Sequence, residues 1–106
     1  MSATDWSTEQ HTIARQAFEL GNKRSVEHLI NTLQEQTKLL DNPESVWKLH
    51  DYLSTERYQY EGRSEYNEGD ILFVLAEMIK QSLITLGDLE GLDDRKITKI
   101  KAMSIF

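Results

Sequence analysis

Apolar residues recur with a helical period along most of the chain. Between residues 44 and 61 they form one stripe, spaced by three, four and seven residues: Val46, Leu49, Leu53 and Tyr60. The period-two alternation of β-branched residues that marks strands is absent, and proline occurs once. The pattern therefore predicts an all-α fold.

The first predicted helix begins after Ser7, which can cap it together with Gln10, and extends to about Leu40. Its apolar residues lie on two sides. One side holds Ile13, Ala17 and Leu20, and the other holds Phe18, Val26, Leu29, Ile30, Leu33 and Leu40. A kink near Gly21 would explain this, as would one long helix that meets its own domain on one side and a second chain on the other. The short chain favours the long helix.

The clearest break in the pattern is at Asn42 and Pro43, a good N-cap followed by a residue suited to the first helical position. The second helix is expected to end near Glu61, with Gly62 as a left-handed C-cap. These two helices predict an extended hairpin over about residues 7–62.

The remainder, about residues 66–106, predicts a compact helical head, so that residues 1–106 form one domain. A helix over about 70–84 is apolar almost all round and should be its buried centre. Thr85 and Asp88 predict a capped short turn. A last helix over about 93–103 is expected to pack through four apolar residues and to carry three lysines towards its C-terminal end, where positive charge is favoured: Leu92, Ile97, Ile100 and Met103, and Lys96, Lys99 and Lys101.

Composition narrows the class of protein. The 106 residues include 12 basic and 18 acidic side chains, a net charge of −6, which argues against a nucleic-acid partner. There is no cysteine, no signal segment and no apolar run near the roughly 20 residues of a membrane span. We expect a cytoplasmic protein, and its small size makes oligomerisation a natural supplement to its core.

One face of the second helix is unusual for a solvated surface. Five side chains fall within roughly 120° of arc when the helix turns by about 100° per residue: Trp47, His50, Asp51, Ser54 and Arg57. Tryptophan and arginine are enriched at interface centres because they bury much area and pair specifically. The face predicts a protein interface. Two plainer interpretations stay open: Trp47 at the edge of the core, and Asp51 in ordinary surface ion pairs with Lys48 or Arg57.

Catalytic and metal chemistry find little support in the sequence. His11, His28 and His50 share no metal-ligand spacing, and the glycines form no phosphate-binding loop. Adjacent helix residues point about 100° apart, so Asp51 is not expected to orient His50. We predict no catalytic residue, metal or cofactor, and therefore no enzyme.

The pattern Trp47-x-Leu49-His50-Asp51-x-Leu53-Ser54 with Arg57 resembles the cyanobacterial fluorescence recovery protein family. The resemblance continues in the head through four further stretches, Ile71-Leu72-Phe73-Val74, Ile79-Lys80, Leu86-x-Asp88-Leu89-x-Gly91-Leu92 and Lys96-Ile97-x-Lys99-Ile100. It is close over about residues 44–103, whereas the first forty residues agree mainly in pattern.

The resemblance implies a helical homodimer that regulates photoprotection without catalysis. Members bind the light-activated orange carotenoid protein, chiefly its C-terminal domain, speed its return to the orange form and release it from the phycobilisome. By the same resemblance, partner binding is assigned to Trp47, His50, Asp51 and Arg57, with Phe73 and Lys99 of the head.

The dimer interface is predicted from the apolar pattern of the two long helices, and it involves Phe18, Leu29, Leu33, Leu40, Val46 and Trp47. Three hypotheses stay open at this point. The α-helical face of Trp47 to Arg57 meets the carotenoid protein, or it builds the dimer, or the chain is an orphan helical adaptor for an unrelated protein. Peripheral association with the thylakoid membrane is also left open.

Overall fold

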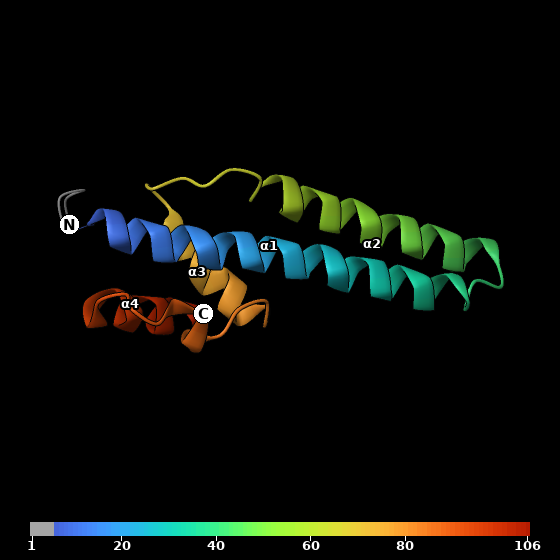
Figure 1. Cartoon of the computed structure of the whole chain (residues 1–106). Coiled ribbons are helices and arrows are strands. Elements are labelled where there is room, and N and C mark those ends of the chain that lie inside the picture. The colour runs from blue at the N-terminus through green and yellow to red at the C-terminus, as the bar shows by residue number, and fades with distance from the viewer. Residues whose placement is uncertain (1–5) are drawn as a thin grey trace. The chain divides into compact units, whose positions relative to one another are not determined.

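The computed structural model describes residues 6–106, and in that range every regular element is helical. The α-helices of this range, labelled in Figure 1, are α1 (Thr8–Thr37), α2 (Pro43–Glu61), α3 (Ile71–Lys80) and α4 (Asp94–Ser104). A short 3-10 helix, η2 (Leu86–Leu89), precedes α4. The prediction of an all-α fold is confirmed.

The chain divides into two compact units. The head unit combines residues 6–22 with 66–106, and the hairpin unit comprises Lys23–Glu65. The helix α1 passes from one unit into the other, because its first half belongs to the head unit and its second half to the hairpin unit.

The helix α1 is continuous from Thr8 to Thr37, so one long helix is confirmed and a break of the helix at Gly21 is wrong. The Ser7 hydroxyl accepts a hydrogen bond from the Gln10 backbone N–H at 3.1 Å, which caps the first turn. Gly21 is needed for a close approach rather than for a bend. A Cβ placed there would lie 2.5 Å from Met78 Sδ.

The core of the head unit lies between the first half of α1 and the C-terminal helices. Ile71, Leu75 and Met78 of α3 and Ile100 of α4 are fully buried in it, and α3 packs directly on α4. Ala14, Ala17 and Phe18 of α1 close the core. Phe18 is only 5 % exposed within the single chain, so it shares the buried side with Ala17 and does not lie opposite it.

The helix α3 ends four residues earlier than the apolar run suggested. The Leu83 N–H donates to Met78 O at 2.8 Å and the Ser82 N–H to Ile79 O at 2.9 Å. Those two bonds form a Schellman motif, in which Ser82 adopts a positive φ of 61°. The apolar residues Leu83 and Ile84 are buried beyond the helix end, which explains why periodicity alone placed them inside it.

The start of α4 holds a buried cation that the sequence did not indicate. Asp93 caps the helix by accepting from the Lys96 N–H at 2.9 Å, and Lys96 Nζ donates to Asp93 Oδ2 at 2.6 Å. Lys96 Nζ also lies 4.7 Å from the Trp6 ring centroid. These contacts compensate the burial of the charge. The placement of Lys96 towards the C-terminal end is therefore wrong, since it lies in the first turn.

The hairpin unit is joined by a well-capped turn. Asn42 Oδ1 accepts from the Ser45 N–H at 2.8 Å, the Ser45 hydroxyl accepts from the Asn42 N–H at 3.2 Å, and Pro43 opens α2 as predicted. At the other end, Gly62 has a right-handed φ of −67°, so the left-handed C-cap is wrong. All of residues 23–65 are described, and none of them is buried.

Candidate protein-recognition site

The helix α2 displays the predicted recognition residues to solvent. Trp47 is 63 % exposed, which excludes it from the core of the single chain. The side chains of His50, Asp51 and Arg57 are more exposed still, at 71 %, 82 % and 82 %. We call Trp47, His50, Asp51 and Arg57 the α2 face.

The cations of α2 are each paired along the helix. Arg57 Nε donates to Glu61 Oε1 at 2.5 Å, and Lys48 Nζ lies 3.5 Å from Glu44 Oε1. Both pairs join residues one turn apart at exposed positions, where an ion pair contributes only a few tenths of a kcal/mol. Both cations therefore pair with glutamates of their own helix and not with Asp51.

His50 and Asp51 do meet, contrary to the angular argument. His50 Nδ1 lies 3.4 Å from Asp51 Oδ1. The two side chains lean towards each other in solvent, which the Cβ directions alone do not forbid. The contact is long for a hydrogen bond, and both groups are exposed. It gives the imidazole no fixed orientation of the kind that a catalytic dyad requires.

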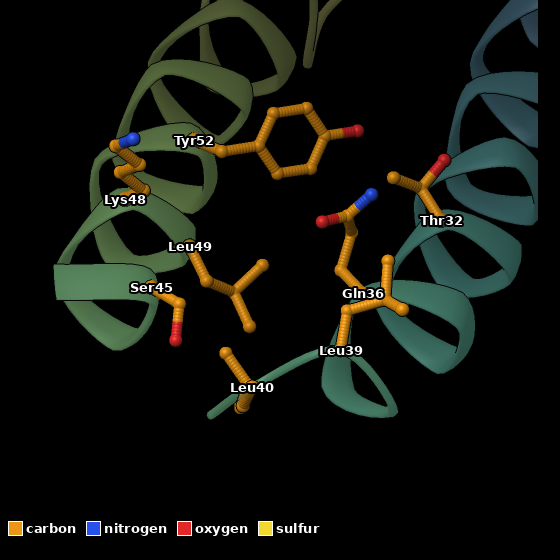
Figure 2. Close-up of a pocket in the computed structure, with 8 residues that line it drawn as sticks. All are labelled: Thr32, Gln36, Leu39, Leu40, Ser45, Lys48, Leu49 and Tyr52. Atoms are coloured by element: carbon orange, nitrogen blue, oxygen red, sulfur yellow. The ribbon is translucent and has the colours of Figure 1, made fainter. Parts of the chain in front are cut away.

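The other side of α2 lines two grooves against the second half of α1. Figure 2 shows the groove at the closed end of the hairpin, where Leu39, Leu40 and Leu49 gather and Tyr52 reaches from α2 towards Gln36. Its volume is about 400 Å³. The predicted stripe thus faces α1 through Leu49 and Leu53, which are half-buried.

The second groove, of about 360 Å³, lies nearer the open end of the hairpin. Its apolar wall consists of Val26, Leu29, Leu53 and Tyr60, and its polar lining consists of Ser25, Glu56, Arg57 and Arg63. Arg57 therefore belongs both to the α2 face and to the edge of an apolar groove. Neither Glu61, which was expected only as the end of the second helix, nor Arg63 was among the predicted site residues. The i, i+4 spacing of Glu61 from Arg57 was the available signal for the first.

The residues predicted for a dimer interface differ in how far they are exposed to solvent. Leu29 and Leu33 are half-buried on α1, whereas Leu40 and Val46 are 37 % and 42 % exposed. Phe18 is occupied in the core of the head unit, which leaves little of its side chain for a second chain.

Phe73 and Lys99, the two predicted contact residues of the head, lie on α3 and α4. Phe73 is 58 % exposed although α3 is largely buried, and Lys99 is exposed too. The expectation that α3 is buried all round is therefore wrong at Phe73. An exposed phenylalanine on a core helix is a plausible contact point, because its burial by a partner is favourable.

The two side chains whose pKa clearly departs from its ordinary value, Tyr66 and Asp93, lie outside the α2 face. Burial raises the pKa of the Tyr66 hydroxyl in the head unit, against the opposing effect of the Arg15 charge. Hydrogen bonds from Lys96 hold the pKa of the Asp93 carboxyl below its ordinary value.

Within residues 6–106, no group of three or more histidine or acidic side chains is arranged to hold a metal ion. Over the same residues, no helix combines the length and apolar character that crossing a bilayer requires.

An exposed face of tryptophan, arginine and carboxylate side chains on a helical scaffold is typical of a small protein that recognises another protein. A family model described as "Photoprotection regulator fluorescence recovery protein" matches residues 6–104. The chain belongs to the fluorescence recovery protein family. The assignment from the α2 and head motifs is thereby confirmed.

Solved and curated relatives agree with this assignment. The fluorescence recovery protein of Fremyella diplosiphon is 34 % identical, with a TM-score of 0.85, over 95 % of this chain and 99 % of that one. The structure from Synechocystis sp. PCC 6803 is 31 % identical with a TM-score of 0.83, over the same shares. The curated Synechocystis protein is 31 % identical over 99 residues, which cover 93 % of this chain and 91 % of its relative.

Proposed function

We propose that this chain is a non-enzymatic regulator that binds the light-activated orange carotenoid protein, mainly at its C-terminal domain. Binding accelerates the red-to-orange return and detaches the carotenoid protein from the phycobilisome, which restores fluorescence and light harvesting. The observation that carries the proposal is the α2 face, with Trp47 exposed beside Asp51 and Arg57, in a member of this family.

The physical requirement on such a regulator is differential affinity. A protein that binds both states of a two-state partner equally well shifts nothing. To accelerate the return, it must stabilise the transition state for re-docking of the partner's domains more than the bound red state. We assign Trp47 and Arg57 to anchoring the surface that the red state exposes, and Asp51 to pairing with a basic group there. Phe73 and Lys99 would add a second contact from the head unit.

The chain would act as a homodimer. The hairpin unit supports this, because none of its residues is buried and its apolar side chains line open grooves. Two helices that bury so little need another surface to cover them. Leu29, Leu33, Leu40, Val46 and Trp47 would contribute to the contact, with a smaller part for Phe18. A C₂ dimer presents the same surface twice, so Trp47 can contribute to both the dimer and the carotenoid protein.

The cellular setting belongs to the same proposal. The regulator would work in the cytoplasm beside the phycobilisome, with any thylakoid association peripheral and no nucleic-acid partner. A light-dependent pull-down with purified orange carotenoid protein separates this function from that of an orphan helical adaptor. Capture in the light and not in darkness supports the function, whereas capture in neither supports the adaptor.

The direct test is the rate of the red-to-orange return in darkness, measured by absorbance with and without this protein. Asp51→Ala and Arg57→Ala should each lose about 2 kcal/mol or more of coupling, which is the effect of truncating a central interface residue. Lys48→Ala is the matched control, because Lys48 is a similarly exposed cation of α2 outside the α2 face. Normal acceleration by both alanine variants would overturn the assignment.

Size measurements on the same variants separate recognition from dimerisation. A variant that stays dimeric but no longer accelerates the return identifies a contact to the carotenoid protein. A variant of Trp47 or Asp51 that becomes monomeric identifies a dimer contact, and the partner site must then be sought elsewhere.

A further inference from the structure

Arg57, the cation of the α2 face, is held by a residue of its own helix. Glu61 follows it by one turn, and the Nε–Oε1 distance of 2.5 Å is a close charge-assisted contact. Both side chains are largely exposed, at 82 % and 59 %. A pair of this kind is weak in water and can be exchanged at little cost.

The Arg57–Glu61 pair matters for recognition because α2 has few cations. The helix carries four carboxylates, Glu44, Asp51, Glu56 and Glu61, against two cations, Lys48 and Arg57. Each cation is paired with a glutamate one turn away. The positive charge of α2 is therefore neutralised locally, and an acidic group that approaches the α2 face meets Glu61 and Asp51 beside Arg57.

Arg57 also borders the groove lined by Val26, Leu29, Leu53 and Tyr60. A carboxylate bound to Arg57 at that edge would lie beside an apolar wall, where charges interact more strongly than in open water. The guanidinium has five N–H donors in a planar fork and prefers a carboxylate that can bind two of them. The hydrogen bond to Glu61 comes from Nε, and it is not the two-donor arrangement that the guanidinium prefers.

We propose that Glu61 is a positioning and specificity-determining residue, which competes with an acidic group of the partner for Arg57. A partner that brings a carboxylate to the groove edge displaces Glu61, and the exchange is driven by the less polar surroundings of the bound state. A partner without such a group leaves the Arg57–Glu61 pair intact and gains nothing from Arg57. This inference rests on the proposed function, because it takes the α2 face to be the partner surface.

The test compares two glutamate-to-glutamine changes on one helix. Glu61→Gln removes the competitor of Arg57. Glu44→Gln removes the equivalent partner of Lys48, at the same spacing and with similar exposure, and is the matched control. Affinity for light-activated orange carotenoid protein is measured for each variant at low and at high salt, with helix content followed by circular dichroism.

We expect Glu61→Gln to bind about two- to fivefold tighter, since it removes a weak pair together with a repelling charge. Glu44→Gln should bind as the parent chain does. The gain should shrink at high salt, because screening weakens exposed charges. In an Arg57→Ala background, Glu61→Gln should tighten binding much less, because only the loss of the repelling charge then remains, and a merely structural role for Glu61 would not produce this dependence.

The outcomes separate the inference from the proposed function. If Arg57→Ala weakens binding while Glu61→Gln leaves it unchanged or weaker, the role of Glu61 is overturned and the proposed function stands. If Arg57→Ala binds as the parent chain does, both are overturned at this face. Tightening by Glu44→Gln to the same extent would show a general charge effect and would also overturn the role of Glu61.

Discussion

Ser82 has a backbone conformation that its side chain disfavours. Its φ of 61° lies in the left-handed region, and among residues 6–106 no other non-glycine residue has a positive φ. The position is C′ of the Schellman motif that ends α3, where glycine is the usual residue. The two bonds of the motif, to Met78 O and Ile79 O, require that conformation. Serine there costs the head unit stability.

Ser82→Gly should therefore stabilise the chain, by about 0.5–1 kcal/mol after the greater flexibility of glycine in the unfolded state is subtracted. Ser82→Ala is the control, because it removes the hydroxyl and keeps the Cβ. Urea unfolding of the three proteins decides the matter. Equal gains in both variants would point to the hydroxyl and not to the backbone.

Single-residue predictions from the sequence succeeded where the chemistry is local. Asn42 with Pro43 and Thr85 with Asp88 form the expected caps, because each needs only side chains three residues away. The prediction of a left-handed C-cap at Gly62 was wrong, because glycine permits a left-handed φ without requiring it. The burial of Lys96 was not predicted, because its ammonium lies over the ring of Trp6, a residue ninety positions away in the sequence.

At the scale of elements, α1 is joined to the start of α4 by hydrogen bonds that the spacing of apolar residues does not predict. The Gln10 side chain donates to Gly91 O at 2.9 Å and accepts from the Asp93 N–H at 3.1 Å. Gly91 adopts a φ of 102°, and a Cβ there would lie 2.6 Å from Ile13 Cδ1. Helix existence was readable from the apolar spacing, whereas this register between α1 and the turn before α4 was not.

The N-cap of α4 predicts a pH dependence of stability. The pKa of Asp93 is lowered from its ordinary 3.8, first by the hydrogen bond from the Lys96 side chain and next by the backbone bond from Lys96. A depressed folded-state pKa contributes stability above the unfolded-state value, and this contribution is lost as the pH falls through the folded-state pKa. Protonation would also remove the negative charge that the buried Lys96 ammonium contacts at 2.6 Å.

Asp93→Asn should therefore be less stable than the parent chain at neutral pH, and the two should converge as the pH falls below about 4. Thermal unfolding between pH 3 and pH 7 measures the difference. Asp94→Asn is the control, because Asp94 lies in the same turn but is exposed. A difference that stays constant across this pH range would contradict the role assigned to the Asp93 charge.

At the scale of the whole molecule, burial is divided unequally between the two units. The buried core belongs to the head unit, whereas residues 23–65 contribute no buried side chain. The sequence predicted a long first helix with apolar residues on two sides. A helix of that length contributes only part of its apolar surface to one core, which agrees with the unequal burial of the two units. The sequence could not predict that the first half of α1 would join the head unit, because such a division depends on contacts between residues far apart in sequence.

The inequality predicts different local stabilities. A unit without a core opens at low free energy unless another surface covers it, so the hairpin unit should depend on dimerisation while the head unit does not. Hydrogen exchange followed by mass spectrometry tests this at high and low protein concentration. Amides of α2 should lose protection on dilution, and those of α3 should keep theirs.

A charged substitution at Val46 provides the second arm of this experiment. Val46→Glu places a carboxylate on a side chain that is 42 % exposed and outside the head core, so it should disrupt a dimer contact without unfolding the head unit. This variant should show weak protection of α2 at every concentration. Strong, concentration-independent protection of α2 in both proteins would mean that the hairpin is stable alone, and the argument from its missing core would fail.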